Sequence, residues 1–306
     1  MSVASQLAYM LALLAVGAGL RAVGVLNEHR RDRLTAVAFY VALPALVFSS
    51  TVTRSLSDVL VWRLFVGVTV VLLAGACIGW LVHRNHATPA RRGVAVVQSY
   101  HSNLGFLGVP FVAATFGGVT AGKASVVLGI ASILQVSLTV LLLTRITSAD
   151  ADVFDELSGL ARNPVLIALA LGLAGGAVGV DLPGVVRGSL DVLGALALPI
   201  ALPAVGASIT AENGLVDPPT VGAIAAVKLL VMPLVAVVVF TGLTASPTTL
   251  RAGVLMLAMP TAVSTYIYSS ELGGDGELAS AGVLATTVAA AATLFGVVQL
   301  LGILTP

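Results

Sequence analysis

The sequence predicts an all-α polytopic membrane protein with ten transmembrane helices in a 5+5 inverted repeat. The 306-residue chain is 58% hydrophobic and only 9% charged, and its mean hydropathy is +1.06. Soluble domains carry about 25% charged residues. The charged residues also leave ten long apolar intervals between them, and the first and second halves of the chain share helix-breaking residues at matching places. These three observations exclude a soluble protein and leave the net charge of +1 uninformative about partners.

The ten intervals without Asp, Glu, Lys or Arg approach or exceed the ~18 to 20 residues that a helix needs to cross a bilayer. They are residues 1–20, 34–53, 64–83, 93–122, 124–144, 163–180, 192–211, 229–250, 252–270 and 278–306. We interpret the first as a retained span, since no basic segment of the signal-peptide type precedes it. We place the start of the eighth near Pro219, so that Lys228 lies inside this span.

The longest polar segment, Thr144–Asn163, has five predicted helices before it and five after it. We therefore predict a first repeat at residues 1–148, a cytoplasmic linker at 149–162 and a second repeat at 163–306. The linker holds an acidic cluster that we interpret as solvated chain rather than as a metal site, namely Asp150, Asp152, Asp155 and Glu156.

The loops predict an orientation, because loops rich in Lys and Arg stay in the cytoplasm. One set of loops carries nine such residues, namely Arg21, Arg30, Arg31, Arg33, Arg84, Arg91, Arg92, Arg145 and Arg162. The opposite set carries five, namely Arg54, Arg63, Lys123, Arg187 and Arg251. We expect a multi-pass protein of the cell inner (plasma) membrane with both termini outside.

The two halves resemble each other at their prolines. "ALPALVF" around Pro44 resembles "ALPIALPAVGASI", which contains Pro199 and Pro203, and Pro110 in the fourth span matches Pro260 in the ninth. Because each half has an odd number of spans, equivalent helices enter from opposite sides, as in secondary transporters with inverted repeats.

Spans four and nine are expected to be broken near the bilayer midplane. The fourth reads "SYHSNLGFLGVPFVAATFG", and its glycines, such as Gly105, and Pro110 weaken a helix. At 1.5 Å per residue, Asn103 lies ~15 Å into its span and Pro260 ~14 Å into the other. Each break alone could be a plain proline kink, but two breaks at equal depth favour a binding site, since open backbone is tolerated only inside protein or beside water.

Several stretches together resemble the auxin efflux carrier family, bacterial relatives of the plant PIN transporters. They are "FYVALPALVFSS", "SNLGFLGVPF", "RNPVLIALALGL", "ALPIALPAVGASI", "VKLLVMP" and "GELASAGVLATT". The resemblance covers essentially the whole chain. It implies the fold of the bile acid sodium symporters, with helices 4 and 9 crossing near the membrane centre, helices 1, 2, 6 and 7 as a scaffold, and a small organic anion as substrate.

The resemblance also implies site residues. Asn103 matches the crossover asparagine that meets the substrate in PIN proteins, and Pro110 matches the proline shortly after it. Ser102 stands where plant proteins have a crossover proline, Thr265 stands at the corresponding place in span nine, and Gln135 matches a polar, substrate-facing residue of span five. The long cytoplasmic loop of plant PINs is absent, and span three has no acidic residue, which puts a plant-like proton relay in doubt.

Lys228 and His101 are the ionisable residues expected inside spans. A lysine at a helix centre costs ~2.5 to 3.5 kcal/mol on insertion scales, so Lys228 should have a role. It could face a carboxylate substrate, change protonation during the cycle, or bond the carbonyls of a broken helix. His101 could sense protons or be a buried structural residue. Four further residues offer hydroxyls around the second break, namely Thr261, Ser264, Thr265 and Tyr266.

We expect a secondary transporter of a small carboxylate, with H⁺ or Na⁺ as coupling ion and no cofactor, metal or catalytic group. The alternative is a sodium-coupled organic anion symporter of the bile acid type, which the sequence does not exclude. An intramembrane hydrolase would need a serine facing a histidine, and His101 is the only histidine inside a span. Membrane lipid and the substrate are the expected partners, nucleic acid is not, and a homodimer stays open.

Overall fold

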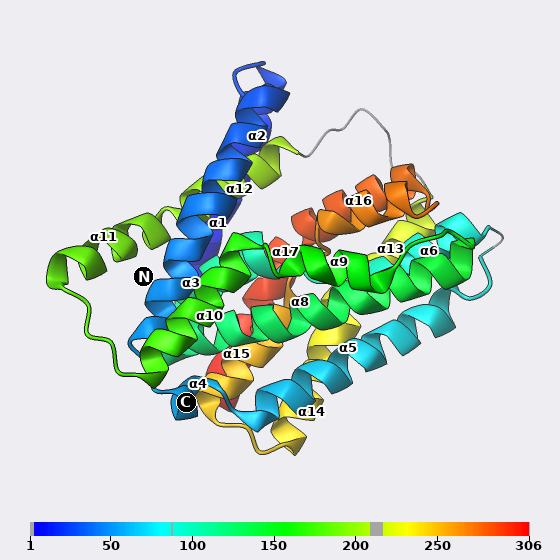
Figure 1. Cartoon of the computed structure of the whole chain (residues 1–306). Helices are drawn as coiled ribbons and strands as arrows, with labels where there is room; N and C mark the ends of the chain where they lie inside the picture. The colour runs from blue at the N-terminus through cyan, green and yellow to red at the C-terminus, as the bar shows by residue number, and fades with distance from the viewer. Residues whose placement is uncertain (1–2, 87, 209–216, 306) are drawn as a thin grey trace. The chain divides into compact units, whose positions relative to one another are not determined.

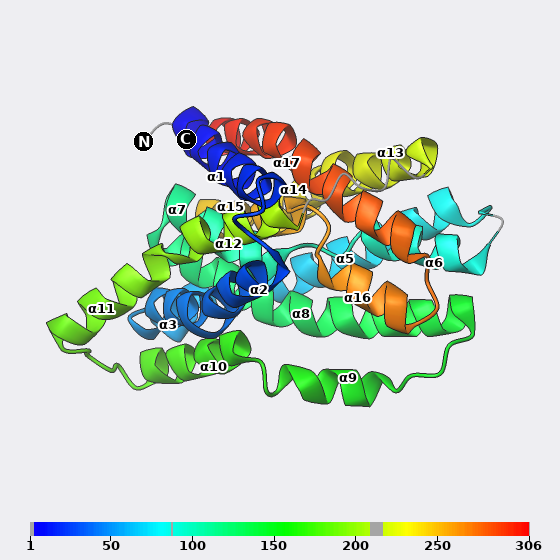
Figure 2. The same ribbon diagram turned by 90° about the horizontal axis from the view of Figure 1, so that it is seen from above.

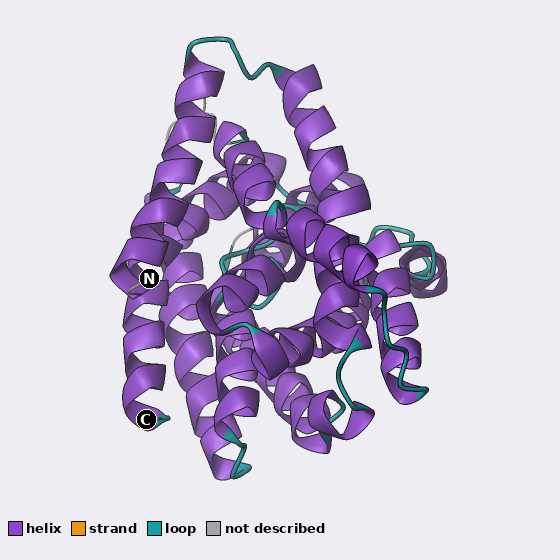
Figure 3. Ribbon diagram, turned by 90° about the vertical axis from the view of Figure 1, so that its left-hand side faces the viewer, coloured by secondary structure: helices purple, strands orange, loops and turns teal. Residues whose placement is uncertain are grey.

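The computed structural model describes residues 3–86, 88–208 and 217–305 (Figure 1). Within these ranges the chain consists of helices and loops without a β-strand (Figure 3). The α-helices are α1 Val3–Ala22, α2 Glu28–Val37, α3 Leu43–Val52, α4 Leu56–Val59, α5 Trp62–His83, α6 Pro89–Gln98, α7 Val109–Phe116, α8 Gly118–Thr147, α9 Val153–Leu160, α10 Pro164–Ala177, α11 Gly184–Ala195, α12 Ala197–Ala207, α13 Pro218–Ala226, α14 Met232–Gly242, α15 Pro247–Ala258, α16 Ser264–Glu271 and α17 Gly276–Leu304. The π-helical turns are η1 Ala38–Ala42, η2 Leu104–Gly108 and η3 Val227–Val231.

Six helical stretches of the described chain are long and apolar enough to cross a membrane, and a seventh is counted if the bent pair α9 and α10 forms one span. The six are Glu28–Val52, Leu56–His83, Gly118–Thr147, Gly184–Ala207, Pro218–Gly242 and Gly276–Leu304. The predicted all-helical membrane class is confirmed, whereas ten spans in a 5+5 repeat stay a prediction. The predicted fourth and ninth spans are divided into shorter helices, and the predicted linker contains α9.

The helices form two compact units that interleave along the sequence. The first compact unit comprises Met1–Val61, Gly105–Gly129 and Ala161–Ala211, and the second comprises Trp62–Leu104, Ile130–Leu160 and Glu212–Pro306. Each unit therefore takes segments from both predicted repeats.

All three π-helical turns of the described chain end two residues before a proline. The pairs are η1 with Pro44, η2 with Pro110 and η3 with Pro233. A proline inside a helix lacks the amide donor and its ring meets the carbonyl four residues back. A wider π turn accommodates both effects without ending the helix. The sequence prediction that Pro110 breaks its span is therefore modified: Pro110 lies where η2 passes directly into α7, and the helix continues through it.

In the first compact unit, small residues bring two pairs of helices close together. α3 packs along α10 (Figure 2), and Gly172 of α10 lies against the side chain of Thr51. α1 packs on α12, where a Cβ atom at Gly17 would overlap the carbonyl of Pro203. Small residues at such contacts let backbones approach closely, which is the main source of helix association in lipid.

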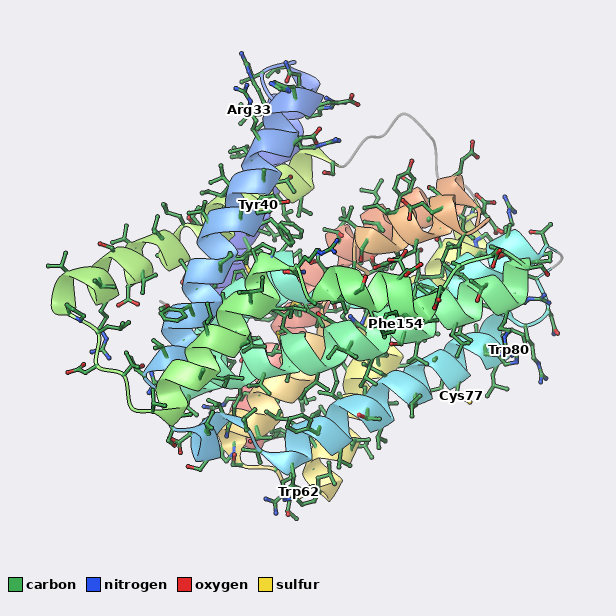
Figure 4. The ribbon with its side chains drawn as sticks, viewed as in Figure 1. Arg33, Tyr40, Trp62, Cys77, Trp80 and Phe154 are labelled. Atoms are coloured by element: carbon green, nitrogen blue, oxygen red, sulfur yellow. The ribbon has the colours of Figure 1, made fainter. Side chains whose placement is uncertain are left out.

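In the second compact unit, α5 carries the marks of a membrane-crossing helix. Trp62 and Trp80 lie near its two ends, ~27 Å apart at 1.5 Å per residue, and both are exposed (Figure 4). Each indole has an arginine guanidinium over its ring, Arg63 at 5.0 Å and Arg92 at 5.7 Å from the centroid. Aromatic side chains at both interfaces about 30 Å apart are typical of a bilayer-spanning helix.

An arginine joins three helices at one end of the second compact unit. Arg91 of α6 donates to Asp275 at 2.9 Å and to Asp217 at 3.3 Å. These carboxylates are the N-caps of α17 and α13. The hydrogen bond from the Thr220 hydroxyl, with Arg91 nearby, holds the pKa of the Asp217 carboxyl below its usual value, so the carboxylate is charged at neutral pH. The start of α6, which leads into the first break, is thereby fixed to the two neighbouring helices.

Gly17→Val should lower the thermal stability of the detergent-solubilised protein, because the added side chain has no space beside Pro203. Overpacking of this kind costs about 1 to 3 kcal/mol. The matched control is Gly19→Val in the same helix, where a Cβ atom meets nothing within 4 Å. Equal melting temperatures for the two variants would contradict the close contact between α1 and α12.

Candidate functional site

Two broken helices cross within the second compact unit. α6 ends at Gln98 and α15 ends at Ala258, and the extended segments that follow meet in an isolated antiparallel β-bridge between Ser102 and Thr261. The Asn103 amide donates to the Pro260 carbonyl at 2.8 Å, and the Ala262 amide donates to the His101 carbonyl at 3.1 Å. Two short extended segments thus bond each other's backbone where both helices have stopped.

The lengths of the half-helices place this crossing deep in the protein. α6 has 10 residues and α15 has 12, which at 1.5 Å per residue correspond to ~15 and ~18 Å. Both lengths are about half of a ~30 Å hydrocarbon core. Backbone without helical hydrogen bonds at that depth needs partners from the protein.

Gln135 of α8 supplies partners for Ser102. Its Oε1 accepts from the Ser102 amide at 2.7 Å, and its Nε2 donates to the Ser102 carbonyl at 3.4 Å. The side-chain amide therefore pairs with the backbone as a neighbouring strand would. The sequence singled out Gln135 as a substrate-facing residue, but both ends of its side-chain amide bond the crossover.

Lys228 holds the crossover from the other direction. Its Nζ donates to Ser102 Oγ at 2.6 Å, to the carbonyl of Leu257 at 2.9 Å and to the sulfur of Met232 at 3.6 Å. The side chain is 0% exposed. Leu257 belongs to the last turn of α15, where carbonyls lack intrahelical partners and carry partial negative charge. Of the roles expected for Lys228, the structure shows the bond to a carbonyl of a broken helix.

The second extended segment is held through Thr261, one of the hydroxyl residues expected at this break, by Gln98 and Thr286, which the sequence did not single out. Thr261 Oγ1 donates to the carbonyl of Gln98 at 2.9 Å, and the Thr261 amide donates to Thr286 Oγ1 at 3.2 Å. Gln98 Nε2 donates to Thr265 Oγ1 at 3.2 Å and to the Ala279 carbonyl at 2.7 Å. The residue opposite Ser102 is therefore Thr261, whereas Thr265 lies one turn on, in α16.

His101 is buried and has a partner for one ring nitrogen. Its Nδ1 lies 2.9 Å from Thr139 Oγ1, which is also 3.0 Å from the hydroxyl of Tyr100. This geometry is that of the buried interpretation made from the sequence; a role in proton coupling stays a prediction.

Asn103 differs from its neighbours, because its side chain is unused. Within the described part of the chain, the carboxamide has no hydrogen-bond partner, although the backbone amide beside it is bonded to Pro260. The side chain keeps some access, with the residue 4% exposed, and its polar atoms are not among those that are sealed without a partner. It is a polar side chain at the crossover that has no hydrogen-bond partner among the described residues.

The remaining predicted residues flank the crossover along the chain. Ser264 and Tyr266 lie in α16, which begins without a side-chain cap, and Tyr266 is 45% exposed. Gly105 and Pro110 belong to η2 and α7 and fall in the first compact unit. Gln98 could have been noticed as a second side-chain amide in the apolar interval that holds Asn103. Nothing in the sequence indicated that Thr139 would bond His101, Thr286 the Thr261 amide, or Met232 the Lys228 ammonium.

Broken helices that cross inside an apolar helical protein are typical of membrane transport proteins. The sequence matches the family described as "Membrane transport protein" over residues 3–155 and 154–298, and the chain belongs to this family. The resemblance to auxin efflux carriers is thereby confirmed. A relative from Rhizobium meliloti (strain 1021), named "Putative malonate transporter", is 25% identical over 277 residues, which cover 88% of this chain and 86% of the relative.

Gly282→Ala should destabilise the crossover, because a Cβ atom at Gly282 of α17 would overlap Gln98 Oε1 and push Gln98 away from Thr265 and Ala279. We expect a lower melting temperature despite the better helix propensity of alanine, which is worth up to about 1 kcal/mol. Gly296→Ala in the same helix is the control, since nothing lies within 4 Å of its added Cβ. A Gly282→Ala protein at least as stable as the control would show that the Gln98 contacts are not needed.

Proposed function

We propose that the protein is a secondary active transporter that moves a small organic anion, of the size and charge of malonate, across the cell inner membrane by alternating access. The observation that carries the proposal is the open carboxamide of Asn103 at the crossing of α6 and α15. Membership of the transport family and the printed name of the relative support it.

The electrostatic surroundings favour an anion. Among the buried residues of the described chain there is no Asp or Glu. Lys228, in contrast, donates a hydrogen bond to Ser102, the residue before Asn103. The Asn103 amide nitrogen offers two donors, and the uncapped start of α16 adds the partial positive charge of a helix N-terminus. Together these groups suit a carboxylate and repel a cationic substrate.

The proposal includes ten spans in a 5+5 inverted repeat, with both termini outside and repeats at residues 1–148 and 163–306. The antiparallel bridge between Ser102 and Thr261 supports it, since equivalent segments of inverted repeats meet head to tail. The compact units support in part a division into scaffold and transport parts: the first holds α1, α3, α10 and α12, from predicted spans 1, 2, 6 and 7, together with Gly105–Gly129 from predicted spans 4 and 5. No enzymatic activity is proposed.

Sodium coupling of the bile acid symporter type is the competing mechanism, and it predicts uptake that depends on external Na⁺. Malonate uptake into proteoliposomes with Na⁺, K⁺ or a proton gradient separates the candidate coupling ions. Absence of malonate uptake under all three conditions would contradict the proposed substrate class.

Asn103→Ala should reduce malonate uptake by roughly tenfold or more, because a hydrogen bond to a charged group contributes about 1.5 to 3 kcal/mol and 1.4 kcal/mol is a factor of ten. The melting temperature should change little, since the Asn103 side chain bonds no other described residue. The control is Ser270→Ala in α16, whose exposed hydroxyl bonds only the Tyr266 carbonyl of its own helix. Wild-type uptake by the Asn103 variant would remove this residue from the site.

A further inference from the structure

Lys228 is a buried cation without a buried anion beside it. The buried residues of the described chain include no carboxylate, and the three groups that Nζ contacts are neutral: a hydroxyl, a carbonyl and a thioether. Three acceptors match the three donors of an ammonium group, since a neutral amine has only two. The contact from Nζ to Ser102 Oγ is 2.6 Å, and hydrogen bonds from a charged donor are shorter than those from a neutral one.

The two oxygen atoms that surround Nζ come from both broken segments. Ser102 Oγ belongs to the strand after α6, and the Leu257 carbonyl belongs to the last turn of α15. The Ser102 hydroxyl also donates to the Leu257 carbonyl at 3.3 Å, so its lone pairs are turned to Nζ. Hydroxyl and carbonyl oxygens at the negative end of a helix are the groups that bind a small monovalent cation in broken transporter helices.

The lysine reaches this position from a third element. It lies in η3, the π turn that precedes Pro233, and its neighbour Met232 one turn on provides the third acceptor. The ammonium is therefore tethered by its own side chain to the helix formed by α13, η3 and α14, and it cannot leave the crossover by diffusion as a free ion would.

We propose that Lys228 is a built-in cation: its ammonium group takes the place of a bound alkali cation at the crossover, positions the two broken helices, and leaves no Na⁺ binding at these oxygen atoms. One consequence of the inference, that substrate uptake is independent of Na⁺, rests on the proposed function. Its structural part, a cation site filled by a side chain, is tested without transport. Lys228 is thus a positioning residue and not a substrate contact.

Chemical rescue tests the inference directly. Lys228→Ala deletes the ammonium together with three methylene groups, which n-propylammonium can replace. We expect a melting temperature about 5 °C lower, because buried acceptors lose their donor, and recovery of most of this loss with millimolar n-propylammonium. 1-Propanol, which has the size without the charge, and tetramethylammonium, which has the charge without N–H donors, should not restore stability.

Lys228→Met is the matched variant, because it fills the same space and leaves no room for the amine. It should be destabilised and unresponsive to n-propylammonium. Should Lys228→Ala not yield folded protein, Ser102→Ala provides the second test. It should lower the melting temperature in the wild type but much less in the Lys228→Met background, since the two residues share one contact.

Three outcomes would each overturn the inference. 1-Propanol restores stability as well as n-propylammonium does, or Lys228→Ala is as stable as the wild type. The third is a rise in the wild-type melting temperature with Na⁺ that Lys228→Met abolishes. Loss of amine rescue with intact malonate uptake refutes the built-in cation alone. Rescue without any malonate uptake by the wild type refutes the proposed function alone.

Discussion

Backbone groups that leave a helix inside a membrane must find partners within the protein, because lipid offers none and each unsatisfied group costs several kcal/mol. The bridge between Ser102 and Thr261 meets this constraint for two helices at once. The bridge pairs the backbone of each segment on one side only. The backbone groups on the other side, and those at the ends of α6 and α15, still need donors and acceptors. The polar side chains buried in the second compact unit are explained by that need.

Each of three buried polar residues bonds a different backbone group of the crossover. Gln135 pairs with both backbone groups of Ser102, Lys228 covers a carbonyl at the end of α15, and Thr261 covers the end of α6 through the carbonyl of Gln98. The result is a non-helical backbone that the protein's own side chains hold in place. The Asn103 carboxamide takes no part in these bonds. In the proposed function it meets the substrate, and a site that is already ordered loses less entropy on binding.

The sequence predicted the class of protein and the place of the breaks, because these depend on local features. Apolar length, Gly and Pro content and the position of Asn103 between charged ends can all be counted along the chain. The particular contacts could not be predicted, since Gln98 with Thr265 and Lys228 with Ser102 are separated by 167 and 126 residues. Local context also altered one element: Pro110 begins α7 after a π turn rather than marking the break, which lies at Ser102 and Asn103.

We propose that two residues of the crossover have separate roles: Lys228 holds the broken helices, and Asn103 meets the substrate. A cryo-electron microscopy structure of the protein in nanodiscs with saturating malonate tests it most directly. The account predicts a malonate carboxylate against the Asn103 carboxamide while Lys228 keeps its contacts with Ser102 and Leu257. A carboxylate bound to the Lys228 ammonium, with those two contacts broken, would contradict it.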